Sequence, residues 1–427
     1  MHIVFYSPQT LPSIGGLQYV VHYWAEALYQ RGYKVTIISE TPESTIDHAK
    51  PTRGDSPIHG VPPYNQTSYS HTYTSYSLSG SSEDDLLPSS GKGPEWGPTI
   101  LRNIPFLQKV SIMRSADKII MFNVSLKGMP AWLLSGKALY LSHHTALWYQ
   151  NGPKPWQQKL KQWVANYIAK KNCACSGYIA SLYQSCEVIY SPYRSDVFIP
   201  GTMPRIPGSI LFAGRLVSDK GADLLLEACA IIKAKGIAFS LTMVGHGPDR
   251  QKLLALAAQL KIYRINSSTE ISYGPVSPPV EGSGGAVVPE GAFSPLAQDF
   301  PLSTKVSPAP VPPPTGGPGG AVSQPLLVHL MQTHEVMVVP SRMEPMGMVV
   351  AEGLACGCNM VVSNQGGMPE VGGSFCHYFE SGNAAGLAVA LEKALTNPLC
   401  VDADALKLHL QQFTIGYSVN QLEKWLA

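Results

Sequence analysis

Two glutamates flank a glycine in the second half of the chain, and their types and spacing could do chemistry. Glu344 follows the apolar run Val336–Val339, and Glu352 lies eight positions later within the apolar segment Met348–Ala355. The run predicts a buried strand, and the segment predicts a helix that starts near Gly347. The start of a helix presents free N–H groups and the positive end of its dipole, which suits a phosphate.

Carboxylates repel a phosphate, so Glu344 and Glu352 need another task beside it. Each can accept paired hydrogen bonds from vicinal hydroxyls, as on a sugar or a ribose. A phosphate group between two polyols is the arrangement found in a nucleotide-sugar. The alternative interpretation is a helix start with an acidic cap and one solvated glutamate.

The sequence PSRMEPMGMVVAEGLACG around these acids resembles the signature of the retaining glycosyltransferases of family 4. The resemblance extends beyond the two acids to the flanking PSR, EP-x-G and LACG. It implies transfer of a sugar from a nucleoside-diphosphate-sugar to an acceptor that the sequence does not identify, with retained anomeric configuration. Met346 departs from the pattern, because the family usually has an aromatic or acidic residue there, and this leaves the donor sugar open.

A second segment, GRLVSDKG, follows the predicted strand Ile210–Ala213 and resembles the second signature of that family. Arg215 and Lys220 flank a turn beyond the carboxyl end of the strand. A guanidinium fork and a point charge at such a turn suit a diphosphate. The alternative is two solvated cations.

Residues 1–41 predict a strand, a glycine loop, a helix and a strand. Gly15 and Gly16 in the loop do not form G-x-G-x-x-G, so the sequence does not support a dinucleotide fingerprint. The family carries a double glycine at this place, which implies a loop whose backbone faces the donor. A tight turn without a ligand is the other interpretation.

Two histidines, His143 and His144, follow the predicted strand Ala138–Ser142. Open α/β sheets bind ligands just beyond the carboxyl ends of their strands. The family has a histidine at such a strand end beside the reacting sugar, and its pattern matches His144 better than His143. For either histidine taken alone, a structural role is the alternative.

The resemblance thus implies catalytic roles for His144 and Glu344. It implies a nucleotide-sugar site made of Gly15, Gly16, Arg215, Lys220, Gly245, Met346, Gly347, Met348, Val349 and Glu352. Glu352 would hold the ribose and Glu344 the sugar hydroxyls, while the cations and the helix start would stabilise the leaving diphosphate. No cofactor and no metal are implied, because the D-x-D of Asp402 and Asp404 stands at a predicted helix start, where N-capping explains it.

Two βα-rich series predict an α/β protein, and the resemblance implies the GT-B fold, in which two Rossmann-like doubly wound domains face a cleft. The expected N-terminal, acceptor-side domain is 1–200, the nucleotide-sugar domain is 209–400, and a helical tail covers 401–427. The polar stretch at about 42–98 and the Pro- and Gly-rich stretch at about 276–325 are expected to be insertions.

The composition limits location and partners. A net charge of +2 over 427 residues gives no reason to expect nucleic acid. No basic leader with an apolar run opens the chain, and no apolar run reaches about 18 residues, so neither a signal peptide nor a spanning helix is expected. The eight scattered cysteines lack zinc-ligand spacing and are expected to be reduced. These features predict a cytoplasmic protein.

The segment Lys154–Lys171 contains five lysines and no acid. Its large apolar residues can share one helix face: Trp156, Leu160, Trp163, Tyr167 and Ile168. A basic amphipathic helix of this kind can lie on anionic lipid, as a peripheral contact on the inner face of a membrane. The alternative, which we expect here, is a solvated helix whose apolar face packs into the core.

Two other function classes remain open from the sequence. One is a non-catalytic descendant that keeps the fold and uses its insertions to bind partners or act as a scaffold. The other is a different GT-B chemistry, such as nucleotide-sugar epimerisation or phosphorolysis. The presence of every charged residue that the resemblance requires argues against the non-catalytic class. The resemblance itself implies a transferase of the hexosyltransferase type, in polysaccharide or glycolipid biosynthesis.

Overall fold

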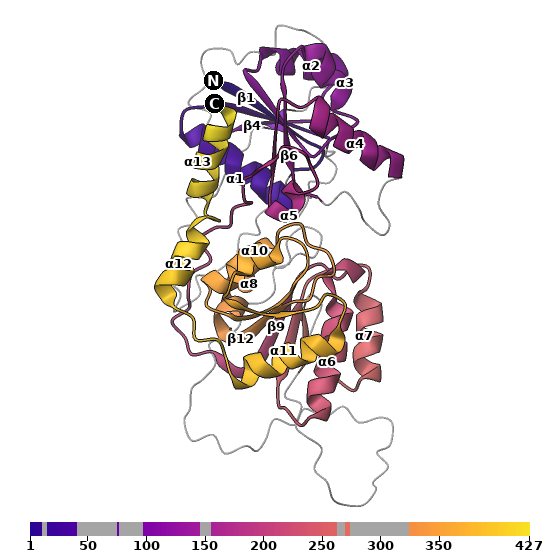
Figure 1. Ribbon diagram of the computed structural model, residues 1–427, viewed down its shortest axis with the longest axis vertical. Coiled ribbons are helices and arrows are strands. Elements are labelled where there is room, and N and C mark those ends of the chain that lie inside the picture. The colour runs from indigo at the N-terminus through magenta and orange to yellow at the C-terminus, as the bar shows by residue number, and fades with distance from the viewer. Residues whose placement is uncertain (11–14, 41–74, 77–96, 146–154, 263–269, 274–323) are drawn as a thin grey trace, which may run out of the picture.

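The computed structural model describes residues 1–10, 15–40, 75–76, 97–145, 155–262, 270–273 and 324–427. These parts form two α/β bodies that follow one another along the long axis of the molecule (Figure 1). The insertions expected at about 42–98 and 276–325 lie almost entirely outside the described residues.

The first body is built on a parallel sheet whose described strands follow the order β3-β4-β2-β1-β5-β6-β7-β8. Its strands are β1 (His2–Ser7), β2 (Lys34–Ser39), β3 (Ser75–Tyr76), β4 (Thr99–Arg102), β5 (Lys118–Phe122), β6 (Leu139–His143), β7 (Lys171–Ala174) and β8 (Glu187–Val188). Its helices are α1 (Gly16–Gln30), α2 (Phe106–Ser115), α3 (Met129–Ser135), α4 (Pro155–Tyr167) and α5 (Gly177–Ala180).

Alternation along β1 divides this body into two cores, because successive side chains of a strand point to opposite faces. Ile3 and Phe5 pack with α1 on one face. Val4 and Tyr6 pack on the other face, with residues of α2, α3 and α4. The helices of the second face therefore form one layer over the sheet.

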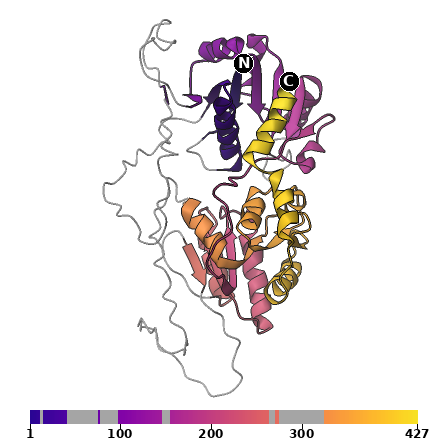
Figure 2. The same ribbon diagram turned by 90° about the vertical axis from the view of Figure 1, so that its left-hand side faces the viewer.

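The chain ends on a helix that returns to the first body, α13 (Ile415–Leu426), shown in yellow beside α1 in Figures 1 and 2. Trp24 Nε1 donates a hydrogen bond of 2.9 Å to Ser418 Oγ, and Leu422 and Trp425 are buried in the core that contains Phe5. The preceding helix, α12 (Ala403–Gln411), packs on the second body instead. The expected tail is thus shared between the two bodies.

The second body has a sheet with the described order β11-β10-β9-β12-β13-β14, in which only β11 is antiparallel to its neighbour. Its strands are β9 (Ile206–Ala213), β10 (Ser240–Val244), β11 (Glu270–Tyr273), β12 (His334–Val339), β13 (Asn359–Ser363) and β14 (Cys376–Phe379). One face is covered by α6 (Ala222–Ala234), α7 (Arg250–Gln259) and α11 (Ala384–Thr396), and the other by α8 (Gln324–Thr333), α9 (Met348–Ala355), α10 (Met368–Gly372) and α12.

The predicted α/β class and the predicted strand and helix around the two glutamates are confirmed, since β12 precedes the loop and α9 begins after Gly347. Capping by Asp402 is confirmed too, because its carboxylate accepts the N–H groups of Asp404 at 2.9 Å and Ala405 at 3.1 Å. In the part of the chain that the structure describes, no helix has the length and apolar character needed to cross a bilayer.

Candidate functional site

The start of α9 requires a glycine. Gly347 has φ 93°, in the left-handed region, and a methyl group there would lie 2.8 Å from Cγ of Met368. The loop before it begins where β12 ends, at the carboxyl edge of the sheet. Because the first N–H groups of a helix have no partner within it, this edge offers the backbone donors that a phosphate needs.

The turns after β9 and β10 reach the same edge and pack backbone against backbone. Gly214 N–H donates to the Val244 carbonyl at 3.1 Å, and a methyl group on Gly245 would lie 1.8 Å from the Gly214 carbonyl oxygen. Gly245 therefore packs against the backbone of Gly214, and this contact supports the turn that carries Arg215. The side chain of Arg215 is exposed, and no hydrogen bond or ion pair ties it to another described residue.

Lys220 and Glu344 form an ion pair, with Lys220 Nζ donating to Glu344 Oε2. Lys220 ends a 3-10 turn (Ser218–Lys220), and Gly221 after it has φ 67°. A methyl group on Gly221 would lie 2.0 Å from the Pro340 carbonyl oxygen, so glycine allows the turn to approach the loop after β12. The structure thus joins the residue expected at the diphosphate to the residue expected at the sugar.

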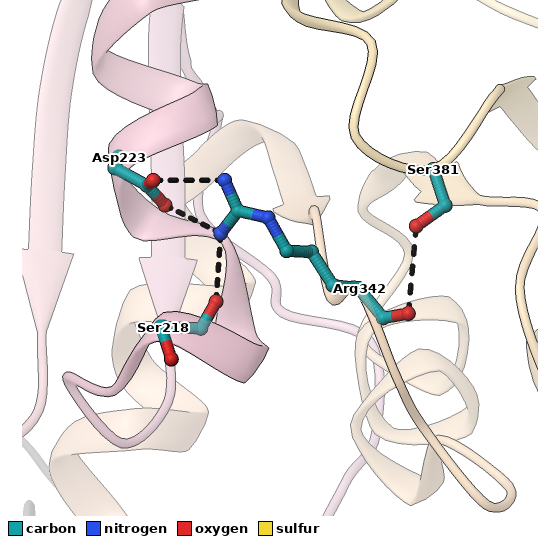
Figure 3. A network of polar contacts seen from close by, with 4 residues as sticks. All are labelled: Ser218, Asp223, Arg342 and Ser381. Carbon is teal, nitrogen blue, oxygen red and sulfur yellow. Dashed lines mark hydrogen bonds and ion pairs between the residues drawn. The ribbon is translucent and has the colours of Figure 1, made fainter. Parts of the chain in front are cut away.

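Arg342 holds these two segments together, and the sequence analysis did not single it out (Figure 3). Its guanidinium makes two hydrogen bonds of 2.8 Å to the Asp223 carboxylate and one of 2.7 Å to the Ser218 carbonyl. Its backbone N–H donates to the Asp219 carbonyl at 2.8 Å. Burial of Asp223 opposes its ionisation, but the bonds from Arg342 hold its pKa below the ordinary value. Arg342 therefore positions Lys220 beside Glu344.

Arg342→Ala is expected to lower the free energy of unfolding by about 1 kcal/mol, because a bidentate charged pair is lost from a half-buried site. Urea denaturation measures this as a lower midpoint at unchanged slope. The control is Lys235→Ala, which removes the more exposed pair with Glu392 and should change stability by less than about 0.5 kcal/mol. Equal effects of the two variants would contradict the positioning role of Arg342.

Glu352 lies in the second turn of α9 and faces the first body. Burial raises the pKa of its carboxyl group to about 7, and no described group donates a hydrogen bond to it. Its described electrostatic neighbours include Tyr19 and Tyr23 of α1, whose pKa values are raised by burial and then by the charge of Glu352. An acid that is partly shielded from solvent and has no donor among the described residues is costly to ionise, and a pKa raised in this way makes Glu352 a candidate for a functional group.

The first residue of α1, Gly16, is close to the start of α9. A methyl group on Gly16 would lie 3.6 Å from Sδ of Met348, and Met348 packs against cores of both bodies. Gly15 has an extended backbone, and a methyl group there would meet the Gln18 side chain at 2.5 Å. The structure therefore brings the beginnings of α1 and α9 together.

His144 is buried, and both of its ring nitrogens have partners. Nε2 lies 2.8 Å from Ser142 Oγ and Nδ1 lies 3.3 Å from Ser191 Oγ, while the ring packs against Trp24 and Phe122. Burial lowers the pKa of His144 to about 3, so the ring is neutral. In this arrangement a ligand would have to displace a serine hydroxyl in order to bind the ring directly.

Met346 connects His144 with the loop before α9. Its side chain is buried, and its sulfur accepts the Ser191 N–H at 3.1 Å, next to the Ser191 hydroxyl that meets His144. The departure from the family pattern at Met346 thus places a sulfur against the first body. Val349, also expected in the site, is partly buried against the same core as Met346.

Glu370 joins the two bodies, and the sequence analysis did not assign it a role. Its carboxylate accepts the backbone N–H groups of Gly177 at 2.7 Å and Tyr178 at 2.8 Å, and the Tyr190 hydroxyl lies 3.3 Å away. Nearby, Ser176 Oγ donates to the Pro345 carbonyl at 2.5 Å. The sequence does show an acid after the glycine pair that precedes α10. The role of Glu370 could not be predicted from it, because its hydrogen-bond partners lie far away in the chain.

Comparison with known proteins links this architecture to glycosyltransferases. The family model described as glycosyl transferases group 1 matches residues 206–265 and 319–408, which include Arg215, Lys220, Glu344 and Glu352. No curated protein sequence matches the chain. Among the described residues, no cluster of His, Cys, Asp and Glu could hold a metal ion.

Solved structures match over nearly the whole chain. HepE of Anabaena, solved with UDP and glucose, matches with a TM-score of 0.63 at 13% identity. The match covers 100% of this chain and 99% of HepE. A glycosyltransferase from Rickettsia africae has 0.61 at 15% identity, and sucrose-phosphate synthase from Thermosynechococcus elongatus has 0.58 at 16%, each with 99% of this chain and 97% of the other chain covered. The chain therefore has the GT-B fold, with a group 1 glycosyltransferase pattern over its second body.

Proposed function

We propose that this protein is a glycosyltransferase that moves a sugar from a nucleoside-diphosphate-sugar to an acceptor, with retention of the anomeric configuration. The observation that carries the proposal is the Lys220–Glu344 pair beside the start of α9, with the unpaired carboxyl of Glu352 farther along the same helix. A cation, a helix N-terminus and two acids match a diphosphate between two polyols.

In the proposed site, the leaving diphosphate lies against the first turn of α9, between Arg215 and Lys220. These fixed positive charges would stabilise the negative charge that develops as the sugar leaves. Glu352 would accept the ribose hydroxyls, which lowers the cost of its ionised form. The UDP and glucose bound by HepE of Anabaena support a uridine nucleotide as the first donor type to test.

On donor binding, the Glu344 carboxylate would exchange its partner Lys220 for the hydroxyls of the donor sugar. When the diphosphate arrives, Lys220 gains a second anionic partner, and Glu344 becomes available to orient the sugar. His144 would act through Ser191 and Met346, which connect its ring to the loop of Glu344. This makes His144 a positioning residue in the ligand-free arrangement.

A thermal-shift panel of nucleoside diphosphates and their sugars tests the proposal most broadly. We expect one nucleotide base to raise the melting temperature, both as the diphosphate and as the sugar conjugate. The anomeric proton coupling of the transferred sugar, measured by NMR, then tests retention. Binding without hydrolysis or transfer would favour a non-catalytic descendant, and a changed sugar at constant linkage would favour epimerisation.

A further inference from the structure

Helix α4 carries large apolar side chains on its outer surface. Trp156 is 58% exposed, Trp163 is 50% exposed and Tyr167 is 62% exposed. With Leu160 they follow a helical spacing of four, three and four residues, which places them on one stripe. We call these four residues the α4 face.

This stripe is not the side of the helix that packs on the sheet. Val164 and Ala165 are the α4 residues in the core of that layer. The expectation that the apolar residues of Lys154–Lys171 pack inward is therefore wrong. The periodicity correctly predicts one apolar face, but a second, smaller apolar face packs on the core.

The helix layer that contains α4 carries further exposed apolar groups and positive charge. Leu133 and Leu134 of α3, in the same layer over the sheet, are 69% and 54% exposed. On α4 itself, Lys159 is exposed and Lys161 half-buried, and neither forms an ion pair with a described acid. Lysine stems can lie along apolar surface while their charges reach outward.

We propose that the α4 face is a docking surface for an anionic lipid bilayer. Tryptophan and tyrosine suit the boundary between headgroups and acyl chains, where one end of the ring is apolar and the other is wet. Unpaired lysines beside them supply charge complementary to anionic lipid. Tryptophan and tyrosine are also enriched in protein interfaces, but lysine is depleted there, so the lysines beside the α4 face favour lipid over a protein partner.

The location of α4 gives this surface a consequence for the proposed function. The helix belongs to the first body and, among the described elements, follows β6, the strand that leads to His144. A bilayer held by the α4 face would therefore contact the body that we assign to the acceptor. This consequence rests on the proposed function, whereas lipid binding itself does not.

Vesicle flotation tests the proposal without any assay of transfer. Full-length protein is mixed with vesicles of phosphatidylcholine alone or of phosphatidylcholine with phosphatidylglycerol, at low and high salt. We expect binding to the anionic vesicles only, and weaker binding at high salt. Lys159→Glu with Trp163→Ser should lower the partition coefficient roughly tenfold or more.

The matched control is Lys407→Glu with Leu408→Ser on α12, a lysine and a 72% exposed leucine on a helix distant from α4 (Figure 1). This control should bind vesicles like the wild type, and circular dichroism should show both double variants folded. Equal loss in the two double variants, or binding that ignores lipid charge, would overturn the proposal. So would a change of sedimentation coefficient in the α4 variant without a change in vesicle binding, because the face would then join copies of the chain.

Discussion

Glu352→Gln is expected to stabilise the ligand-free protein above neutral pH and, at the same time, to weaken its binding of a nucleoside diphosphate. Burial raises the pKa of this carboxyl group from 4.5 to about 7, so ionised Glu352 opposes folding. Glutamine carries no charge and avoids that cost. Such a group lowers the stability of the ligand-free protein but contributes to ligand binding, which is a common trade-off between stability and function.

The sign of the pH dependence follows from the raised pKa. Below pH 4.5 Glu352 is protonated in both the folded and the unfolded chain, so wild type and Glu352→Gln should differ little. Between pH 4.5 and about 7 the folded protein keeps a proton that the unfolded chain has lost, so wild-type stability falls as the pH rises. Above pH 7 the deficit is constant, at about 2 kcal/mol once residual solvent contact is allowed for.

Urea denaturation at pH 5 and pH 8 measures this difference, and calorimetry measures the binding. Glu227→Gln, on an exposed position of α6, is the matched control and should change neither property. A Glu352→Gln variant that is less stable than wild type at pH 8 would contradict the desolvation cost of the ionised Glu352 carboxylate. A variant with unchanged diphosphate affinity would contradict the ribose contact and leave the stability argument intact.

Glu344→Gln is expected to reduce turnover on the order of 100-fold while the affinity for the diphosphate is kept or increased. The substitution removes the negative partner of Lys220, which is then free to bind phosphate. The loss should fall after donor binding, because the sugar hydroxyls lose a charged acceptor that fixes their pose.

Lys220→Gln is the complementary variant and should fail at the binding step instead. It leaves Glu344 without its cation, next to the place where the diphosphate would lie. Steady-state kinetics with calorimetry separates the two variants. If both lose diphosphate affinity equally, Lys220 and Glu344 act as a structural pair, and the separate roles proposed for them are wrong.

The local elements of this site were predictable because their signals are short in range. The apolar run of β12, the break at Gly347 and the apolar segment of α9 lie next to one another in the chain. The helix start therefore follows from pattern and backbone chemistry alone. The same holds for the capping role of Asp402, whose partners are two and three residues away.

The contacts between distant segments could not be read in the same way. Lys220 and Glu344 are separated by 124 positions, and each looks like a free charged residue when it is considered alone. The return of α13 to the first body and the reach of Glu370 to Gly177 depend on how two sheets are placed. The exposure of the α4 face could not be predicted either, because periodicity identifies an apolar stripe but does not show whether another part of the protein covers it.

Calorimetric titration with UDP tests the central claim, a nucleoside-diphosphate site at the start of α9, most directly. We expect saturable binding by the wild type, roughly tenfold weaker binding by Arg215→Ala, and unchanged binding by Lys252→Ala, which removes a solvent-exposed cation from α7. If all three proteins bind UDP with the same affinity, the diphosphate does not lie beside Arg215. No heat from the wild type with UDP or with any other nucleoside diphosphate would contradict the account as a whole.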